Sequence, residues 1–594
     1  MTKKLMLKQL ASMLASFKRK KKYYCEVEYI ESTEKDSFFP LFPADNLVDS
    51  TTTWEVRLAF NDVSSTGQLM GYGYSGNNRY NLGIESNKFR FAYSTNWFDA
   101  AIATPDTNPH TWKLEPINGK DANAYIDGQV TSTTASSDFG AHEWFIGVGG
   151  RSTGSNQIQS SNQFGWKLYY SKIWKAGRLV LDVIPVLDWD MKPCLYDRIS
   201  DNLIYATIRY IPSAGGEYAN VTTGREIHYV DYLESTGTQY IDTGIYLTNN
   251  HSIEIDYQLT STDLSVQARK GLYGGLVTSR HGALLSPTNR YLEAGYGEGN
   301  NYYQLGMPDT NRHVLYQKKN ELYFDGALTY TFATATFTQA STAPLGSFDY
   351  TNYNPAYAKY YSSRWWDGNT LVRNYKPAID ENGICFWFDR VTHTIYDNAG
   401  TDAFKYSARE VEYLESTGTQ WINTGINVDT STDEIKLYFE LKETENYKWF
   451  FGEYDENKRI GLGSGDGTDK RNFLYQQSAT KVSDTRMYNT QHLFEINSNG
   501  GFLDGTKIRD YLSFASTSYI YLFNLNIDSP SDYRCKSKIW GYEHKRNGIL
   551  IRNFIPCYKD GVACMVDKLT GTAYLNQGTG TFVTGKVKES EYLE

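Results

Sequence analysis

Residues 410–426 read E-V-E-Y-L-E-S-T-G-T-Q-W-I-N-T-G-I, and copies of this stretch divide the chain. A second copy begins at Arg225 and reads R-E-I-H-Y-V-D-Y-L-E-S-T-G-T-Q-Y-I-D-T-G-I. A degenerate copy, E-Y-I-E-S-T, occupies residues 28–33. Tyrosines at the same place in the copies are 203 and 181 residues apart: Tyr29, Tyr232 and Tyr413. A period of that length suits a whole domain rather than a solenoid unit, so we expect three related domains in tandem.

The composition of the 594-residue chain favours β-structure and argues against binding to nucleic acid. Its formal net charge is −9, whereas nucleic-acid-binding chains usually carry a basic stripe. Aromatic residues make up 15% of the chain, and 49 glycines accompany only 15 prolines. Aromatic side chains favour half-buried strands, and glycine with Asn and Asp supplies the turns between them.

Each expected domain repeats the same strand signals in the same order. Three segments alternate apolar and polar residues: 54–60, 253–259 and 435–441. Such alternation predicts a strand with one buried face and one wet face, as in an antiparallel sandwich. An Asp-Gly pair between apolar runs follows in each domain, at Asp127, Asp325 and Asp504. This pair predicts a tight hairpin, because both turn residues tolerate positive φ.

The opening motif, the Asp-Gly hairpin and a closing segment of the form K-I-W…I-P…C-x-x-D-[RK] together resemble a known family. They are similar to the concanavalin A-like, laminin-G-like jelly-roll modules of gut bacteriophage virion proteins and some gut bacterial surface proteins. The resemblance implies an all-β fold of three tandem jelly-roll β-sandwiches. The expected boundaries are 24–214 for module 1, 225–408 for module 2 and 409–588 for module 3. Residues 589–594 resemble the start of a further module.

The start of module 1 and the links between modules lead to two further expectations. Module 1 departs from the opening motif after Thr33, which leaves the pairing of its first strand open. The links between modules, near 213–224 and 407–409, are short. Short links leave neighbouring modules little slack, so we expect a semi-rigid rod.

Residues 1–23 are expected to form a short amphipathic helix that attaches or oligomerises the protein. Its apolar stripe consists of Met6, Leu7, Leu10, Met13, Leu14 and Phe17. A helix this short needs a partner in water, and a frayed tail or a basic membrane-surface helix are the alternatives. Lys3 and Lys4 precede the apolar run, but Lys8 and Gln9 interrupt it and no small-residue cleavage site follows. The basic cluster 18–22 lies behind the run, where a signal peptide carries no such charge, which argues against a signal peptide. The run is also too short to span a membrane, so no membrane span is expected.

The family resemblance implies a non-enzymatic virion surface protein, a head or tail fibre of a gut phage such as a crAss-like phage. Its lectin-like modules would bind host-surface glycans. Fibre proteins are commonly homotrimers, so we expect a trimer bound to a capsid or tail protein through the helix, made in the host cytoplasm. A cell-surface glycan depolymerase and a bacterial surface adhesin are the alternatives, and the lack of a signal peptide counts against the adhesin.

Glycan binding would use exposed aromatic faces flanked by amides and charged groups on loops. Four such loops are expected, at 74–79, 95–99, 280–289 and 454–458. The candidate glycan-binding residues on them are Tyr74, Asn77, Asn78, Arg79, Trp97, Arg280, Asn289, Tyr454, Asp455 and Asn457. Solvated turns whose aromatic side chain packs in the core are the alternative.

No catalytic residue is predicted. Jelly-roll glucanases resemble one another in a strand-borne E-x-D-x-E or E-x-D-x-x-E, which provides the nucleophile and the acid. The nearest match is residues 254–259, E-I-D-Y-Q-L, where Gln258 and Leu259 stand in place of the acid. Modules 1 and 3 lack even this partial match, so hydrolysis is not expected.

No cofactor is predicted either. The nine histidines show no H-x-x-x-H pair and no grouping with cysteine, so we expect no transition-metal site. Loops 455–457 and 465–467 offer oxygen ligands for calcium, but ordinary turn chemistry explains them equally well. Equivalent cysteines in separate modules, Cys194, Cys385 and Cys564, predict buried thiols. A bridge within module 3, among Cys535, Cys557 and Cys564, stays open as an alternative.

Overall fold

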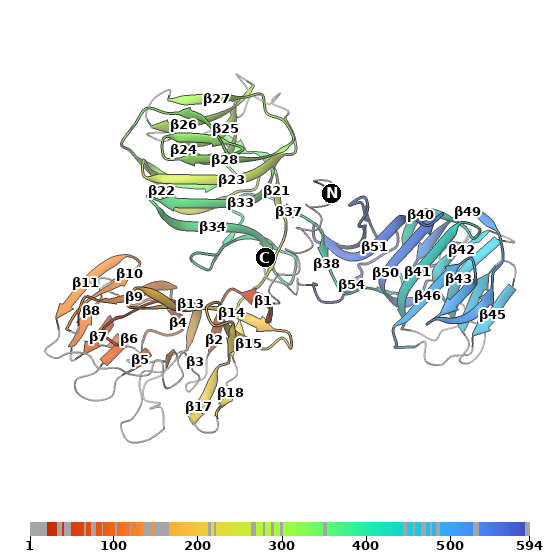
Figure 1. Cartoon of the computed structure of the whole chain (residues 1–594), viewed down its shortest axis with the longest axis horizontal. Coiled ribbons are helices and arrows are strands. Elements are labelled where there is room, and N and C mark those ends of the chain that lie inside the picture. Colours follow the sequence, from red (N-terminus) through yellow and green to blue (C-terminus); the bar gives the residue numbers. More distant parts are fainter. Residues whose placement is uncertain are drawn as a thin grey trace, which may run out of the picture.

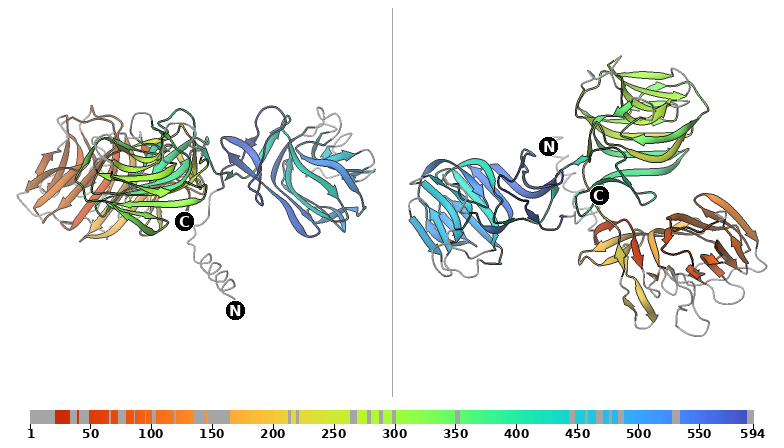
Figure 2. Two further views of the ribbon diagram at one scale, coloured as in Figure 1. Left: turned by 90° about the horizontal axis from the view of Figure 1, so that it is seen from above. Right: turned by 180° about the vertical axis from the view of Figure 1, so that it is seen from behind.

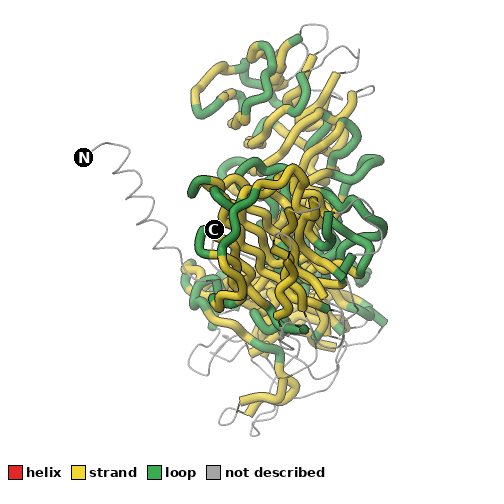
Figure 3. The backbone as a smooth tube through the Cα atoms, turned by 90° about the vertical axis from the view of Figure 1, so that its right-hand side faces the viewer, coloured by secondary structure: helices red, strands yellow, loops and turns green. Residues whose placement is uncertain are grey.

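The computed structural model is all-β in the part of the chain that it describes, with strands joined by loops and turns (Figure 3). It describes residues 21–588 apart from 33–38, 41–48, 65–66, 73–78, 86, 95, 101–103, 119, 135–144, 147–164, 212–214, 219–220, 263–268, 277–279, 287–289, 298–300, 349–352, 443–447, 456–457, 465–470, 476–477, 483–487 and 527–533. Residues 1–20, which hold the apolar stripe of the predicted helix, and the tail over 589–594 lie outside this part. The last residue of the predicted helix, Tyr23, belongs to a strand. Across the described residues, no helix has the length and apolar character needed to cross a membrane.

The strands form three β-sandwiches, each with its own hydrophobic core (Figure 1). In every sandwich the larger antiparallel sheet has one and the same strand order. In module 1 it runs β11 (Gln129–Thr134), β10 (Asp121–Ile126), β9 (His110–Pro116), β4 (Thr52–Phe60), β13 (Trp166–Lys175), β14 (Arg178–Asp188), β15 (Pro193–Asp197) and β16 (Asn202–Ile204). In module 2 it runs β30 (Ala327–Thr331), β29 (Glu321–Phe324), β28 (Arg312–Lys318), β23 (His251–Leu259), β33 (Tyr357–Asp367), β34 (Thr370–Ile379), β35 (Cys385–Asp389) and β36 (Thr394–Asp397). In module 3 it runs β48 (Thr506–Asp510), β47 (Gly500–Leu503), β46 (His492–Asn497), β41 (Asp433–Leu441), β50 (Lys536–Arg546), β51 (Ile549–Lys559), β52 (Val562–Asp567) and β53 (Ala573–Tyr574).

A second, smaller sheet covers the apolar face of each larger sheet. In module 1 its order is β3 (Phe39–Pro40), β12 (Phe145–Ile146), β5 (Gly67–Tyr72), β6 (Arg79–Glu85), β7 (Lys88–Ser94) and β8 (Asn96–Asp99). In module 2 it is β22 (Ile241–Thr248), β31 (Thr338–Leu345), β24 (Arg269–Leu276), β25 (Arg280–Ser286), β26 (Tyr291–Gly297) and β27 (Tyr302–Gly306), with β32 (Tyr353–Pro355) beside β24. In module 3 it is β40 (Ile422–Asp429), β49 (Ala515–Leu522), β42 (Trp449–Asp455), β43 (Lys458–Ser464), β44 (Arg471–Tyr475) and β45 (Ser478–Val482). The shared order confirms the predicted all-β sandwich.

The remaining short strands lie at the beginnings and ends of the modules. They are β1 (Tyr23–Val27), β2 (Ile30–Ser32), β17 (Thr207–Ile211), β18 (Gly215–Tyr218), β19 (Thr222–Thr223), β20 (Glu226–Tyr229), β21 (Leu233–Thr236), β37 (Lys405–Tyr406), β38 (Arg409–Glu410), β39 (Leu414–Thr417) and β54 (Val583–Thr584). In the described part of module 1, β3 takes the place of β22 and β40, since it pairs with β12 as they pair with β31 and β49.

The alternating segments form strands with one buried face, and the Asp-Gly pairs form turns. In β4, Trp54, Val56 and Leu58 are buried while the residues between them are partly exposed, as alternation predicts. The three Asp-Gly pairs form two-residue hairpin turns in which both residues have positive φ, for example 47° at Asp127 and 80° at Gly128. These are the φ signs of the type I′ hairpin turn. The hairpin prediction is confirmed in all three modules.

The opening motif ties the start of a module to its end. In module 2, Oε1 of buried Gln239 accepts hydrogen bonds from the Thr236 N–H at 2.7 Å and the Ser235 hydroxyl at 3.1 Å. Its Nε2 donates to the carbonyl oxygen of Ala403 at 3.1 Å, near the end of the module. Gln420 makes the same set of bonds in module 3, reaching the carbonyl oxygen of Thr581 at 3.0 Å. The residues that define the repeat therefore have a structural role.

The three modules surround a shared hub, and the predicted rod is wrong (Figures 1 and 2). Strand β1 pairs with β20, so the larger sheets of modules 1 and 2 are continuous. The Tyr24 hydroxyl donates to the carbonyl oxygen of Val587 at 2.5 Å, which joins module 1 to module 3. The Tyr406 N–H donates to Asp560 Oδ1 at 3.0 Å, which joins module 2 to module 3. The modules therefore contact one another through the residues at their beginnings and ends, and do not extend away from one another in a line.

The cysteines are buried, as predicted. Cys557 and Cys564 lie directly opposite each other on β51 and β52, but no disulfide joins any pair of cysteines in the described residues. Burial raises the pKa of Cys557 to about 12 and that of Cys564 to about 11. Both therefore remain protonated, unreactive thiols at neutral pH.

Candidate functional site

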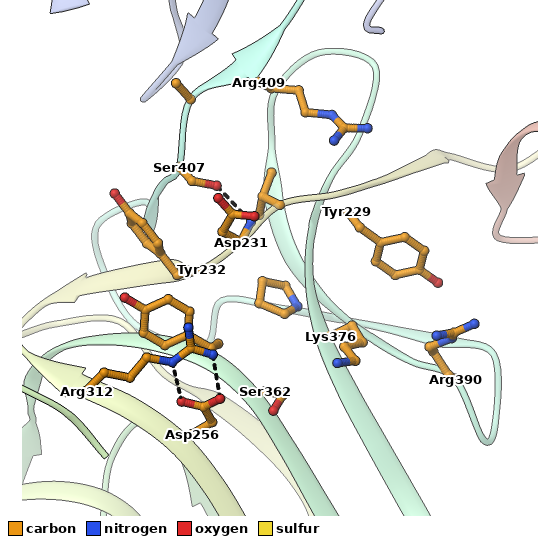
Figure 4. Close-up of a pocket in the computed structure, with 14 residues that line it drawn as sticks. Tyr229, Asp231, Tyr232, Asp256, Arg312, Ser362, Lys376, Arg390, Ser407 and Arg409 are labelled. Atoms are coloured by element: carbon orange, nitrogen blue, oxygen red, sulfur yellow. Dashed lines mark hydrogen bonds and ion pairs between the residues drawn. The ribbon is translucent and has the colours of Figure 1, made fainter. Parts of the chain in front are cut away.

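A polar cavity of about 510 Å³ lies on the outer face of the larger sheet of module 2, beside the hub (Figure 4). Its floor consists of residues on the wet face of β23, β28, β33 and β34. Its walls are the segments 229–232, which enters module 2, and 407–409, which leaves it. Two hydrogen bonds hold these walls in place: the Asp231 N–H donates to Ser407 Oγ at 2.8 Å, and the Val230 N–H donates to the carbonyl oxygen of Pro377 at 3.1 Å.

The cavity carries more positive than negative side chains. Its charged lining residues are Asp231, Asp256, Arg312, Lys376, Arg390 and Arg409. Four cations against two carboxylates leave an excess of two positive charges. A recess with charge of one sign attracts ligands of the opposite sign, so the lining favours an anionic ligand.

One ion pair dominates the floor. Arg312 donates from Nε to Asp256 Oδ1 at 2.8 Å and from Nη2 to Oδ2 at 2.7 Å, as Figure 4 shows. The hydrogen bonds that Arg312 donates to Asp256 are the main cause of the raised pKa of Arg312. The guanidinium carbon also lies 3.6 Å from the centre of the Tyr361 ring, so the cation is held by a carboxylate and an aromatic face together.

Three tyrosines complete the lining: Tyr229, Tyr232 and Tyr361. The rings of Tyr232 and Tyr361 meet edge to face with their centres 5.7 Å apart. Burial raises the pKa of all three hydroxyls, with nearby carboxylates adding to the effect at Tyr229 and Tyr232. They therefore remain neutral at physiological pH. The Tyr229 hydroxyl donates to Glu26 Oε2 at 2.9 Å and the Tyr361 hydroxyl donates to Gln258 Oε1 at 2.8 Å, so these two oxygens would serve a ligand as acceptors. Flat aromatic faces next to such hydroxyls suit a polyhydroxylated ring.

The structure places few of the predicted glycan-binding residues. Tyr74, Asn77, Asn78, Asn289 and Asn457 lie outside the described residues, as do the side chains of Arg79, Trp97 and Asp455. None of the ten lines the cavity described above. Tyr454 is half-buried in β42 and packs against Trp449 and Leu525, which matches the alternative of an aromatic tucked into the core.

Arg280 is not on an exposed loop, contrary to the prediction. It begins β25 and is only 6% exposed. Its Nη1 lies 3.7 Å from Oε2 of Glu293, which is also buried, and its guanidinium lies 4.9 Å from the Tyr302 ring centre. The buried Glu293 carboxylate offsets part of the cost of burying the Arg280 guanidinium in the smaller sheet.

The carboxylates of the partial glucanase match are each paired with an arginine. Asp256 binds Arg312, and Glu254 Oε1 accepts hydrogen bonds from Nε and Nη2 of Arg364. The two arginines neutralise both acids on the wet face of β23. Residues 456–457 and 465–467 of the proposed calcium loops lie outside the described part.

Comparisons with known proteins find only remote likenesses. No family model matches the sequence, and no match is found among curated proteins. Among solved structures, domains LG4-5 of the mouse laminin alpha1 chain align at 12% identity and a TM-score of 0.21, covering 60% of this chain and 93% of that chain. The LG1-3 region of the laminin alpha2 chain aligns at 7% identity and a TM-score of 0.28, covering 95% of this chain and 99% of that chain. Similarity this low carries no argument about the fold, the ligand or the role of this chain.

Proposed function

We propose that this chain is a non-enzymatic glycan-binding protein of a virion surface, and that the module 2 cavity holds an anionic sugar. The observation that carries the proposal is the cavity lining, which combines three tyrosines with an excess of two positive charges. Carboxylate or sulfate groups on the glycan would meet the arginines and the lysine. The tyrosine faces and hydroxyls would meet the sugar ring.

The pairing of the acids on β23 supports a binding role rather than hydrolysis. A retaining glycosidase needs two carboxyl groups about 5 Å apart that take turns at the sugar, one of them able to donate a proton. Asp256 and Glu254 are instead held by charge-assisted hydrogen bonds from Arg312 and Arg364. Because these bonds occupy oxygens of both carboxylates, neither acid is placed to act at a sugar.

The virion role and the oligomeric state belong to the same proposal. The sequence resemblance supports a head or tail fibre, and the apolar stripe of residues 1–23 supports a homotrimer attached to a capsid or tail protein. Light scattering after size exclusion, with and without residues 1–22, tests the trimer. Cryo-electron microscopy of the native particle tests whether the chain lies on the virion surface. Absence of the chain from the particle would contradict the virion role.

A pair of matched arginines tests the cavity. Arg312→Gln removes the guanidinium that binds Asp256 on the cavity floor. Arg364→Gln removes the guanidinium that binds Glu254 on the same strand, and Arg364 does not line the cavity. The two side chains are similarly exposed, 54% and 48%. On an array of neutral and anionic glycans we expect Arg312→Gln to weaken binding about tenfold, or about 1.4 kcal/mol, and Arg364→Gln to change it less than twofold.

The remaining results of the array separate the alternatives. Equal losses in the two variants, or a preference for neutral glycans, would contradict the cavity proposal. Loss of binding only when Tyr74 and Trp97 become alanine would place the site on the module 1 loops instead. Release of reducing ends from capsular polysaccharide would support the depolymerase alternative.

A further inference from the structure

The antiparallel pair of β1 and β20, which joins modules 1 and 2, brings together three side chains of unusual chemistry. Glu26 lies opposite Ile227, and Val27 lies opposite Glu226. Continuing this register by one residue puts Cys25 opposite His228. Glu226 and His228 are two residues apart on one strand, so their side chains point to the same face of the sheet.

The atoms of this group are close. Cys25 Sγ, a carboxylate oxygen of Glu226 and a ring nitrogen of His228 all lie within 4.8 Å of one another. Nε2 of His228 is 2.7 Å from Oε2 of Glu226. Cys25 and His228 are almost completely buried, whereas the side chain of Glu226 is 20% exposed.

Thiolate, imidazole and carboxylate are the three protein ligand types that bind zinc. In a tetrahedral zinc site, neighbouring ligand atoms are about 3.5 Å apart, so the present spacing needs a side-chain movement of only about 1 Å. The same trio would also suit a nucleophilic cysteine with its base, but a nucleophile must be reached by its substrate, and Cys25 is 0% exposed. The burial therefore favours a metal over a substrate.

We propose that Cys25, Glu226 and His228 bind one Zn²⁺ ion at the junction of modules 1 and 2. A fourth ligand position is available to water, because a neighbouring cavity of about 180 Å³ is lined by Glu226 and His228. Glu381, which also lines this cavity, accepts a hydrogen bond from the Glu226 N–H at 3.2 Å and supports the ligand strand. The site is independent of the glycan-binding proposal.

The ligands come from two modules, so the ion would act as a clamp. Cys25 belongs to module 1, and the other two residues open module 2, about two hundred positions further along the chain. The sequence predicts no transition-metal site, because its histidines and cysteines show no ligand spacing along the chain. A site that exists only when the modules meet couples metal binding to their association.

Cobalt substitution of the full-length chain tests the site. After removal of metal with a chelator, one equivalent of Co²⁺ should produce a thiolate-to-cobalt charge-transfer absorption and the visible bands of a tetrahedral site, and Zn²⁺ should displace it. Elemental analysis of the zinc-loaded chain should give one ion per chain. Cys25→Ser should abolish the charge-transfer absorption, and His228→Gln should weaken zinc binding by about tenfold or more.

Cys194→Ser is the matched control, because Cys194 is a buried thiol of the same module outside the group. It should bind Co²⁺ and Zn²⁺ as the wild type does. Absence of the charge-transfer absorption in the wild-type chain would overturn the proposal whether or not the variants fold. Unchanged cobalt spectra in a folded Cys25→Ser variant would overturn it as well.

Discussion

A histidine–aspartate pair recurs at the Asp-Gly hairpin of every module. The pairs, with their Nδ1–Oδ2 distances, are His110–Asp127 at 2.6 Å, His313–Asp325 at 2.8 Å and His492–Asp504 at 2.6 Å. In each pair the other carboxylate oxygen accepts the backbone N–H of the residue after the histidine. The aspartate thus fastens the turn to the preceding strand. Three histidines that look scattered in the sequence are equivalent structural residues.

Asp127→Asn should lower the pKa of His110 and weaken module 1. The hydrogen bond that His110 donates to Asp127 is the main cause of the raised pKa of His110, ahead of the opposing effect of burial. A raised pKa contributes stability that is complete below the unfolded value near 6.5 and is lost as pH rises through the folded value. The contribution should be roughly 1 kcal/mol, since Asp127 is nearly half exposed.

Nuclear magnetic resonance titration of ¹³C-labelled histidine measures this shift, and urea denaturation at pH 6 and pH 9 measures the stability. Asp325→Asn is the control, because it should shift His313 and leave His110 unchanged. A His110 pKa that stays raised in Asp127→Asn would contradict the assignment.

At the scale of elements, the opening motif works as a latch between the first and last strands of a module. Strand β39 pairs with β54, and Gln420 bonds both the turn after β39 and the carbonyl oxygen of Thr581 just before β54. Gly418 in that turn has a φ of 103°, which favours glycine over other residues. The identity of this motif in modules 2 and 3 follows from the demands of the latch.

Gln420→Ala should destabilise module 3 by roughly 3 kcal/mol. The substitution removes the bond that the buried Ser416 hydroxyl makes to Gln420 Oε1, and the part-buried bonds to the Thr417 N–H and the Thr581 carbonyl oxygen. Three hydrogen bonds at about 1 kcal/mol each give this total. Urea denaturation with hydrogen-exchange readout of β39 and β54 measures the loss. Gln577→Ala, an exposed glutamine of the same closing segment, should change stability by less than about 0.5 kcal/mol. Equal effects in the two variants would argue against the latch.

The sequence predicted the elements well because their signals are local. Alternation placed β4, β23 and β41, and Asp-Gly placed the hairpins, since both patterns depend on residues next to one another. The cavity gave no such signal. Asp256, Arg312 and Lys376 occupy polar positions of alternating strands, where a charged residue is expected on any solvated face. Only the tertiary arrangement shows that they face one recess.

At the scale of the whole molecule, Glu26 connects modules 1 and 2 at the hub. It is buried, and Oε2 accepts the Tyr229 hydroxyl at 2.9 Å. Oε1 accepts the Tyr23 hydroxyl at 3.4 Å and lies 4.0 Å from Nη2 of Arg390. Tyr229 and Arg390 also line the module 2 cavity, so the hub contact shapes the proposed glycan site.

Glu26→Ala should open the hub, because it leaves the Tyr229 hydroxyl without its acceptor and removes the carboxylate that lies 4.0 Å from Arg390. The substitution should weaken the association of modules 1 and 2 by roughly 2 kcal/mol. The β1–β20 pairing is short, so we expect it to open. Small-angle X-ray scattering should then give a larger radius of gyration, and proteases should cleave faster between Ile211 and Glu226. Glu115→Ala removes a glutamate that accepts the Tyr125 hydroxyl within module 1 alone, so it should leave the shape unchanged. An unaltered radius in Glu26→Ala would mean that backbone pairing alone holds the modules together.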